Sequence, residues 1–532
     1  MGFNMDEFDF IVVGGGSGGS AVAGRLSEGG KYSVCLLEAG GQNDQIRVRA
    51  PGLMPFLPAS TNWKFDTVPQ RGLNGRTGFQ PRGKGLGGSS AINAMVYIRG
   101  CAWDYDNWAA LGCDGWAYKD VLPYFKRSES NARGGNDYHG DAGPLSVSDQ
   151  KWPNPGSMAF IESAAELQLP RNADFNGAQF EGVGLYQVTQ KNGERWTSAR
   201  AYVAPQREAG RLDVRTGALV ETLIIENGRV VGVKYAQGKT PKQVRACRAV
   251  ILAGGVFGTP QTLMLSGIGP ADHLRALGIP VLVDRPAVGS HLQDHIDYVS
   301  SFKTGGNVMM GSTPGAIART AKALVEWLRF RTGTLTTPYA EAGGFLKSRP
   351  DVEVPDVQLH FVPAMLEDHG RTNVAGIGFS CHVCVLRPYS EGTVRLADAN
   401  PRSAPLIDPA FLTDDRDMAV LKDGVRVMHR ILTSGPLGGF GGIDRHITPI
   451  NDDAALEAMI RERADTVYHP VGTARMGSDD NAVCDTRLRV RGIDGLYVAD
   501  ASIMPRLISG NTNAPSMMIG ERCADFILSD LD

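Results

Sequence analysis

One glycine pattern near the start of the chain constrains the fold more than any other feature. A β-branched and aromatic run at residues 8–13 leads directly into Gly14-Gly15-Gly16-Ser17-Gly18-Gly19, which fits G-x-G-x-x-G. Residues 20–26 then favour a helix, and residues 32–37 are typical of a second buried strand, which ends at Glu38. This order of strand, glycine turn, helix and strand predicts a βαβ unit that binds a dinucleotide.

Each glycine of the turn has its own expected task. Gly14 permits the tight turn, Gly16 lets the backbone approach a pyrophosphate at the helix N-terminus, and Gly19 lets the helix pack closely on the strand. Glu38 follows at about the spacing of the carboxylate that accepts a hydrogen bond from a ribose hydroxyl. The motif alone could mark only a glycine-rich turn, but strands, helix and acid together favour dinucleotide binding.

Length and charge limit the classes of protein that fit. The 532 residues are too many for one ordinary core, so we expect two domains with room for a large cofactor. A net charge of -3 without basic runs argues against a nucleic-acid partner. The first residues lack the pattern of a secretion signal, and no stretch reaches the roughly 18 continuous apolar residues of a membrane span. We expect a cytoplasmic protein; peripheral attachment to the inner face of the cytoplasmic membrane stays open.

The cysteines and the closely spaced histidines do not predict a metal site. Eight cysteines are scattered through the chain, so reduced thiols are expected. Cys381 and Cys384 match C-x-x-C, but on the strand expected there their side chains would point to opposite faces. His291 and His295 are four residues apart, as on one face of a helix, yet the sequence offers no evident third ligand. We therefore expect no bound metal.

Two further glycine-rich segments also favour a nucleotide. Residues 82–94 place four glycines and two serines before a helix-compatible run, a composition suited to cradling an anion or a flat ring. Residues 249–253 are typical of a strand. After them, we expect Thr259 to be a helix N-cap, Pro260 the first helical residue and Gly267 the end of the helix.

Together these segments resemble one known family, the glucose-methanol-choline (GMC) oxidoreductases. Residues 83–93 are similar to its first signature, and residues 259–269 are similar to its second. Residues in four further segments are similar to the rest of the family pattern: 288–295, 468–473, 495–502 and 510–513. The resemblance therefore covers essentially the whole chain. Within the family, residues 93–100 and 187–193 look most like bacterial FAD-dependent alcohol, choline and sorbose dehydrogenases.

The resemblance implies an α/β fold (α+β overall), with a Rossmann-like FAD-binding domain and a substrate-binding domain built on an antiparallel sheet with helices. The FAD-binding domain would be discontinuous and comprise residues 1–150, 195–300 and 460–532. The substrate-binding domain would comprise residues 151–194 and 301–459. Residues 358–362 and the strand around Cys381 fit its sheet, and residues 320–331 are typical of an amphipathic helix.

The same resemblance assigns the chemistry to a histidine. Oxidation of an alcohol by a flavin requires a base with a near-neutral pKa to remove the hydroxyl proton, and histidine meets that requirement. His469 matches the family's catalytic base. Asn511 matches the base's partner, whose amide can position the substrate oxygen but cannot act as a base. Tyr468 matches a position that lines the substrate pocket. The plainer alternatives are a core histidine bonded to the backbone and a core tyrosine.

The resemblance also implies FAD as the cofactor. The residues expected to bind it are Gly14, Gly16, Ser17, Gly19, Glu38, Ala39, Arg82, Gly87, Gly88, Ser89, Asn93, Ala94, Met95, Val96, Val220, Asp500, Ala501, Asn511 and Thr512. Ile92 occupies the position at which some relatives attach FAD covalently through a histidine. We therefore expect non-covalent FAD.

These expectations combine into FAD-dependent oxidation of a primary alcohol to the aldehyde, with hydride transfer to flavin N5 and electrons passed to a quinone-like acceptor. An uncharged alcohol fits better than choline, because the sequence shows no evident carboxylate and aromatic faces for a quaternary ammonium. An oxygen-using alcohol oxidase, a choline dehydrogenase, a hydroxynitrile-type lyase and a non-catalytic flavin protein are the alternatives. A nicotinamide enzyme fits poorly, because residues 83–90 and the segment of Asp500 would have no role in it.

Overall fold

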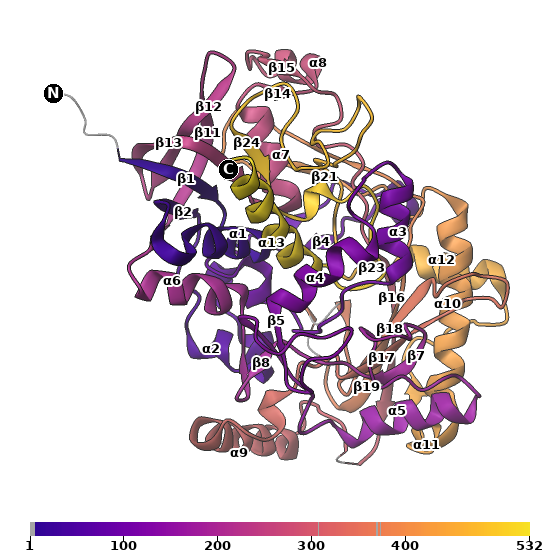
Figure 1. The fold of residues 1–532 in the computed structure, drawn as a ribbon. Helices are drawn as coiled ribbons and strands as arrows, with labels where there is room; N and C mark the ends of the chain where they lie inside the picture. The colour runs from indigo at the N-terminus through magenta and orange to yellow at the C-terminus, as the bar shows by residue number, and fades with distance from the viewer. Residues whose placement is uncertain (1–5, 307, 369–370, 373, 532) are drawn as a thin grey trace.

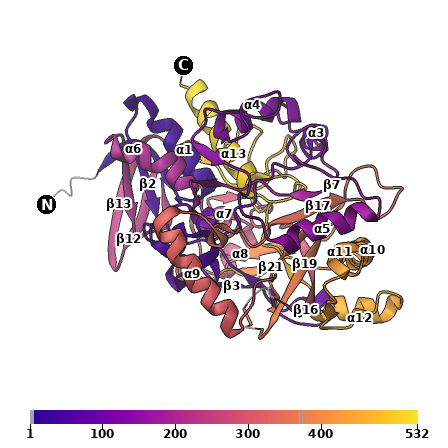
Figure 2. The ribbon, with the colours of Figure 1, turned by 90° about the horizontal axis from the view of Figure 1, so that it is seen from below.

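Two large sheets with helices around them organise the chain (Figures 1 and 2). The structure is a computed structural model that describes residues 6–306, 308–368, 371–372 and 374–531. The helices are α1 (Ser17–Ser27), α2 (Ile46–Arg49), α3 (Ala102–Ala110), α4 (Tyr118–Ser128), α5 (Pro155–Glu166), α6 (Ala204–Glu208), α7 (Gly255–Leu265), α8 (Ala271–Ala276), α9 (Pro314–Phe330), α10 (Asp415–Thr433), α11 (Gly435–Gly438), α12 (Asp453–Arg463) and α13 (Asn513–Ser529).

The first sheet contains the predicted βαβ unit. Its strands are β1 (Glu7–Val13), β2 (Val34–Glu38), β10 (Leu212–Thr216), β11 (Ala218–Glu226), β12 (Arg229–Gln237), β13 (Thr240–Leu252) and β24 (Leu496–Val498). They lie in the order β10-β2-β1-β13-β12-β11, with β24 also paired to β13. The pairs among β10, β2, β1, β13 and β24 are parallel, whereas β11, β12 and β13 pair antiparallel. Every residue of β2 is buried, as expected for a parallel strand covered on both faces.

Helix α13 brings the C-terminal segment to the glycine turn at the start of α1. The two helices pack against each other, and α1 also packs on β1 and β2. Ser17 Oγ donates to Asn513 Oδ1 at 2.7 Å, which joins the first residues of α1 and α13. Further along, the Arg25 guanidinium makes hydrogen bonds of 2.8 and 2.9 Å to the buried carboxylate of Glu521. Two helix N-termini therefore lie side by side at the end of β1.

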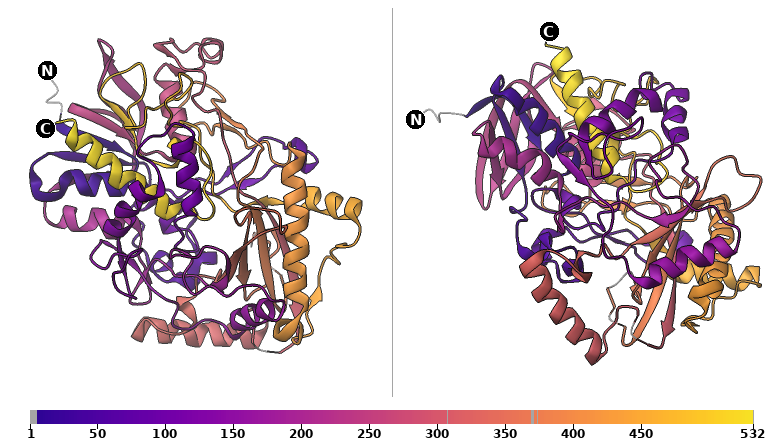
Figure 3. Two further views of the ribbon diagram at one scale, coloured as in Figure 1. Left: turned by 45° about the vertical axis from the view of Figure 1, so that its right-hand side comes forward. Right: turned by 60° about the horizontal axis from the view of Figure 1, so that its bottom comes forward.

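The second sheet is antiparallel, as expected from the sequence. Its strands are β7 (Gly182–Leu185), β16 (Ile296–Thr304), β17 (Ala342–Leu346), β18 (Val357–Val362), β19 (Ile377–Val385), β22 (Ile443–Asp444) and β23 (Asp465–Thr466). The order is β22-β16-β19-β18-β17-β7, and β23 pairs with β16. Figure 3 (left) shows α10, in orange, lying along this sheet. Apolar residues of α10 pack with Leu359 and Val383 on that face.

The two faces of this sheet differ in chemistry because side chains alternate along each strand. Leu359 and Val383 face α10, whereas His360 and His382, which are paired in register, line a cavity on the other face. The same alternation separates Cys381 from Cys384, which pack in different apolar clusters.

The shorter strands are β3 (Phe65–Asp66), β4 (Phe79–Gln80), β5 (Glu129–Asn131), β6 (Leu145–Val147), β8 (Gln190–Lys191), β9 (Glu194–Arg195), β14 (Ile268–Gly269), β15 (Val283–Asp284), β20 (Thr393–Arg395) and β21 (Leu406–Asp408).

One expected helix start is wrong. Helix α7 begins at Gly255, so Thr259 is not its N-cap and Pro260 lies inside the helix. An interior proline removes the amide that would bond the carbonyl four residues earlier, here that of Val256. The hydroxyl of Thr473 donates to this carbonyl at 2.6 Å instead, which explains how the helix tolerates the proline. The expected end is confirmed, because α7 stops at Leu265 and Gly267 follows with a φ of 81°.

Two other expectations need adjustment. The helix expected at residues 320–331 is α9, which begins earlier, at Pro314. The run after the glycines of residues 82–94 forms only the short turn η5 (Gly88–Ala91). Over the described residues, no helix is long and apolar enough to cross a membrane.

Candidate active site

A cavity of about 880 Å³ lies between the carboxyl ends of β1 and β2 and the polar face of the second sheet. All but two of the site residues expected from the sequence line it, namely Gly14, Gly16, Ser17, Glu38, Ala39, Arg82, Gly88, Ser89, Asn93, Ala94, Met95, Val96, Val220, Tyr468, His469, Asp500, Ala501, Asn511 and Thr512. The two exceptions lie just behind its wall. Gly19 packs under Gly14, and the Gly87 amide donates to the Gly15 carbonyl at 2.8 Å.

The glycine turn has the shape that a pyrophosphate needs. A Cβ added to Gly16 would meet no atom of the chain within 4 Å, because this residue borders the open cavity. A Cβ on Gly19 would instead lie 1.9 Å from the Gly14 carbonyl oxygen, so helix and turn touch there. The N-termini of α1 and α13 converge beside this open space, and their amides and dipoles favour an anion. The residues at this end of the cavity therefore fit the diphosphate of FAD.

Glu38 links three loops at the first sheet. Its Oε2 accepts from the Gly15 amide at 2.8 Å, and its Oε1 accepts from the amides of Gly40 and Gly85 at 2.7 and 2.9 Å. The sequence predicted only a ribose contact, but the carboxylate also joins the first glycine turn to the segment of residues 82–94. It still lines the cavity, so a ribose hydroxyl could reach it there.

Asp500 holds the start of α7 against the C-terminal segment. Its Oδ2 accepts from the Gly255 amide at 2.8 Å and from the Thr259 hydroxyl at 2.6 Å, while Oδ1 accepts from the Ser502 amide at 2.8 Å. Burial raises the pKa of this carboxyl, and the hydrogen bonds act in the opposite direction. Thr259 thus contacts the site through Asp500, although its predicted capping role is wrong.

Two histidines determine each other's protonation at the far end of the cavity. Nε2 of His295 lies 3.0 and 3.1 Å from the carbonyl oxygens of Leu386 and Ile508, so this nitrogen must carry the proton. In neutral His295, Nδ1 then has the lone pair, and it lies 3.0 Å from Nδ1 of His469. His469 therefore donates from Nδ1, which leaves the lone pair on its Nε2.

Asn511 faces that lone pair. Its Nδ2 lies 3.1 Å from Nε2 of His469, and its Oδ1 accepts from Nε2 of Gln358 at 3.2 Å. These contacts orient the amide with its N–H group towards His469. His469 and Asn511 both line the cavity, so a hydroxyl group can reach an acceptor and a donor together.

The surroundings of His469 keep its ring neutral. Burial lowers its pKa well below 6.5, and His295, His360 and Arg82 lower it further. Burial likewise lowers the pKa of His295 to about 3. The pKa of His469 is therefore lower than the near-neutral value expected from the sequence. Both rings are neutral near pH 7, so Nε2 of His469 has a lone pair there that can accept a proton.

The backbone around His469 is held in an unusual conformation. Tyr468 has a φ of 71°, a left-handed conformation that costs a bulky residue on the order of 1–3 kcal/mol. Asp294 compensates by accepting from the His469 amide at 2.8 Å and from the Thr466 hydroxyl at 2.6 Å. Arg82 donates to the Tyr468 carbonyl at 2.6 Å. These bonds aim His469 into the cavity and fix the adjacent Tyr468.

Several residues of this site were missed from the sequence. His295 contacts the expected base directly, and His360 and His382 line the cavity from the second sheet. Nδ1 of His382 lies 2.7 Å from the buried carboxylate of Asp297. The signal for His360 and His382 was the period-two pattern of their strands, but the pattern alone does not tell which face meets the cavity.

The spacing of His291 and His295 is not helical, because residues 288–295 do not form a helix. Nδ1 of His291 lies 3.0 Å from the Glu391 carboxylate, whereas His295 turns towards His469. Within the described part of the chain, no three His, Cys, Asp or Glu side chains are grouped as metal ligands. The two histidines therefore act at different places.

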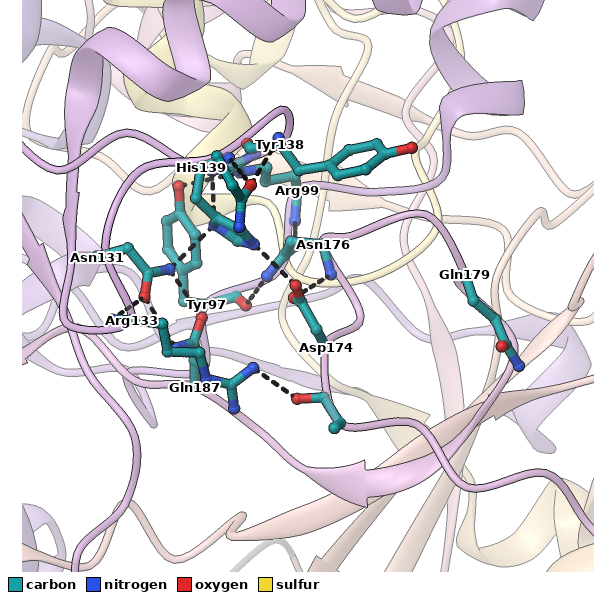
Figure 4. A network of polar contacts seen from close by, with 12 residues as sticks. Tyr97, Arg99, Asn131, Arg133, Tyr138, His139, Asp174, Asn176, Gln179 and Gln187 are labelled. Atoms are coloured by element: carbon teal, nitrogen blue, oxygen red, sulfur yellow. Dashed lines mark hydrogen bonds and ion pairs between the residues drawn. The ribbon is translucent and has the colours of Figure 1, made fainter.

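A buried polar network supports the wall that follows Val96 (Figure 4). Its centre is His139, whose Nδ1 lies 2.8 Å from Glu129 Oε1 and whose Nε2 lies 2.9 Å from Asp174 Oδ2. Arg99 is also paired with Glu129. Burial lowers the pKa of His139, but the hydrogen bonds to Asp174 and Glu129 outweigh it and raise the pKa above 6.5.

Comparison with known proteins shows the family of the chain. Two family models described as GMC oxidoreductase match residues 8–297 and 388–520. The chain is 43% identical to the alcohol dehydrogenase [acceptor] of Pseudomonas putida, over 99% of this chain and 96% of the relative. It is 40% identical to the oxygen-dependent choline dehydrogenase of Brucella anthropi, over 98% and 96%. The crystal structure of pyridoxine 4-oxidase from Mesorbium loti superposes with a TM-score of 0.87 at 30% identity, covering 97% of this chain and 98% of that one. The chain belongs to the GMC oxidoreductase family of FAD-dependent flavoproteins.

Proposed function

We propose that the protein oxidises a primary alcohol to the aldehyde with non-covalently bound FAD and passes the electrons to a quinone-like acceptor. The observation that carries the proposal is the lone pair on Nε2 of His469, which faces the Asn511 amide inside the cavity. A neutral, oriented imidazole beside a hydrogen-bond donor is what removal of a hydroxyl proton requires. The similarity to an alcohol dehydrogenase [acceptor] supports the same reaction.

In the proposed reaction, the alcohol oxygen takes the place of the direct contact of 3.1 Å between Asn511 Nδ2 and His469 Nε2 and bonds to both groups. His469 accepts the hydroxyl proton at Nε2, while its Nδ1–H group remains bonded to His295. Asn511 donates to the oxygen, which stabilises the developing negative charge. FAD, when bound, supplies the acceptor for the hydride that leaves the alcohol carbon. Tyr468 lines the pocket beside the base.

The residues proposed to hold FAD fall into two groups along the cavity. The diphosphate would lie at Gly14, Gly16 and Ser17, next to the N-termini of α1 and α13, with Glu38 at the ribose. The remaining residues proposed to line the cofactor are Gly19, Ala39, Arg82, Gly87, Gly88, Ser89, Asn93, Ala94, Met95, Val96, Val220, Asp500, Ala501, Asn511 and Thr512. Ile92 lines the cavity and has no nucleophilic atom, which supports non-covalent binding.

Choline is the second candidate substrate, because choline dehydrogenases are also close relatives. A quaternary ammonium needs a carboxylate or aromatic faces around it. Among the described residues that line the cavity, the carboxylates are Glu38 and Asp500, and both bond to backbone amides on the first-sheet side. Aromatic side chains do line the cavity, Tyr339 and Tyr468 among them, so only the lack of a carboxylate beside His469 favours an uncharged alcohol.

A substrate and acceptor panel tests the proposal. The purified flavoprotein is mixed without air with primary alcohols of increasing chain length, with choline and with a hydroxynitrile, and the flavin absorbance is followed. Air or a soluble quinone is then added. Bleaching by primary alcohols with faster reoxidation by quinone is the expected result. Faster reoxidation by air would indicate an oxidase, stronger bleaching by choline a choline dehydrogenase, and cleavage of the hydroxynitrile without bleaching a lyase.

We also propose the two-domain division expected from the sequence, with two changes. Residues 296–300 and 460–466 belong with the substrate-binding domain, because β16 begins at Ile296 in the second sheet and β23, which ends at Thr466, pairs with it. Strands β20 and β21 belong with the FAD-binding domain, since Val394 and Ile407 pack in the core of the first sheet. Residues 1–5 and 532, the ends of the expected ranges, lie outside the described residues.

A further inference from the structure

Helix α9 exposes a stripe of apolar side chains on the outside of the molecule. Ile317, Val325 and Leu328 are 61%, 55% and 46% exposed. With Ala321 they follow each other at spacings of four, four and three residues, which places them on one face of the helix. Figure 2 shows α9 at the periphery of the fold. A stripe of this kind on a surface helix is characteristic of an interaction site.

A different face of α9 attaches it to the protein. Ala323 and Trp327 are buried and pack in one cluster with Leu335, and Leu53 packs against that cluster. Nε1 of Trp327 also donates to the Gly193 carbonyl at 2.8 Å. The exposed stripe therefore lies on another face than the one that packs in this cluster.

Basic residues lie beside the apolar stripe. Lys322 and Arg329 follow it at about a quarter of a turn around the helix. Helix α9 contains three basic residues and one acid, Glu326, which gives it a net charge of +2 in a chain whose net charge is -3. The carboxylate of Glu326 accepts from the Thr332 hydroxyl at 3.0 Å. The surface that meets this helix should therefore be apolar within and negatively charged at its boundary.

The cavity reaches the surface close to α9. Pro55 and Ala59 line the cavity and are exposed, and Phe56 between them is 59% exposed. Pro55 and Phe56 end the turn η2 (Pro51–Phe56), which packs on the turn η7 (Thr334–Thr336), and η7 packs on α9. A partner that covers the apolar stripe would lie near this opening.

We propose that α9 docks the protein on a membrane surface that contains anionic lipids. The apolar stripe would enter the boundary between headgroups and acyl chains, and Lys322 and Arg329 would meet the headgroup phosphates. The charge of the helix favours this partner over a second copy of the chain, which would present the same positive charge. Docking goes beyond the proposed reaction, and it would bring the opening near Pro55 to the layer in which poorly soluble alcohols and quinones dissolve.

Vesicle flotation of the FAD-loaded protein tests the proposal. The vesicles contain phosphatidylcholine with or without phosphatidylglycerol. The variants are Val325→Glu/Leu328→Glu in the stripe, Lys322→Gln/Arg329→Gln beside it, and the control Leu282→Glu. Leu282 is 57% exposed and directly precedes β15, which Figure 1 shows at the top of the molecule, far from α9.

The wild type and Leu282→Glu should float with the anionic vesicles much more than with the neutral ones, and added salt should release them. The stripe variant should lose at least about tenfold in affinity, because two charges would have to enter an apolar layer. The Lys322→Gln/Arg329→Gln variant should lose about fivefold per cation.

Two results would overturn the docking proposal. The first is a wild type that does not float with anionic vesicles, or a stripe variant that floats as well as the wild type. The second would come from analytical ultracentrifugation without lipid. It is a wild type that is a dimer and a stripe variant that is a monomer, when neither protein floats with vesicles. Reduction of a soluble dye by an alcohol should stay the same in all variants. Its absence in the wild type would count against the proposed reaction and leave the flotation result standing.

Discussion

Nδ1 of His295 lies 3.0 Å from Nδ1 of His469, and its other ring nitrogen bonds to two backbone carbonyls. A residue that lies outside the substrate contacts therefore fixes the tautomer of the proposed base. Without this contact, His469 could carry its proton on Nε2 and present a donor to the alcohol in place of an acceptor. His295 is thus a positioning residue for the proposed reaction.

The His295→Gln variant should lower kcat about tenfold or more, because one buried hydrogen bond that fixes the base is worth on the order of 1–2 kcal/mol. FAD content should stay the same, since the side chain is directed to His469 and to backbone carbonyls. The His291→Gln variant, four residues earlier and at the surface, is the control. Steady-state kinetics with a primary alcohol measure both. Equal kcat values for the two variants would argue against a positioning role.

The activity should depend on pH through the lowered pKa of His469. The ring is neutral and able to accept a proton above its pKa, which burial places well below 6.5. The value of kcat/KM should therefore stay level from about pH 6.5 upwards and decline only in more acidic solution. A profile of kcat/KM against pH for a slow primary alcohol measures this. A rise of kcat/KM centred at pH 7 or above would show that the histidine is not shifted as the structure indicates.

Alanine substitutions at two glycines of the first turn should have different effects, one on FAD affinity and the other on the stability of the apoprotein. Gly16→Ala adds a Cβ that meets no atom of the chain, so the free energy of unfolding of the apoprotein should change little. Its FAD affinity should drop, because the new methyl group takes space proposed for the pyrophosphate. Gly19→Ala places a Cβ 1.9 Å from the Gly14 oxygen and should destabilise the apoprotein itself by about 1–3 kcal/mol. Denaturant unfolding and FAD titration separate the two effects, and equal apoprotein stabilities would contradict them.

His139 should make part of the stability pH-dependent. Its folded pKa is raised, so its contribution is complete below the unfolded pKa of about 6.5 and is lost as pH rises through the folded value. The pKa values of Glu129 and Asp174 are lowered, so both carboxylates remain ionised in mild acid. The difference in unfolding free energy between the wild type and His139→Asn should therefore shrink from pH 6 towards alkaline pH. The Asp174→Asn variant should show a shallower slope, and a difference that grows with pH would contradict the assignment.

The parts of the fold that depend on local sequence were predicted best. The βαβ unit needs only a run of apolar residues, the glycines and a helix, and β1, α1 and β2 lie where the sequence places them. Helix α7 was misplaced because its start depends on distant bonds: the Gly255 amide donates to Asp500, and the Thr473 hydroxyl donates to the Val256 carbonyl. A local rule for proline at the first helical position could not include them.

In the candidate site too, residues within local motifs were predicted and residues placed by distant contacts were not. His469 and Asn511 were found through motif resemblance, but the partner of His469 was not. His295 acquires its orientation from carbonyls of Leu386 and Ile508, which are far away in the sequence. His360 and His382 meet the cavity only because β18 and β19 pair in one particular register. Contacts of this kind are properties of the assembled sheets and have no local signal.

The role of His469 is tested most directly by the rate at which a primary alcohol bleaches the flavin without air, in the wild type and in His469→Gln at equal FAD content. The wild type should bleach rapidly and the variant about 10²–10⁴ times more slowly, because the base is lost while the cofactor site is kept. Equal rates in the two proteins would contradict the role of His469, and a wild type that no primary alcohol bleaches would contradict alcohol oxidation itself.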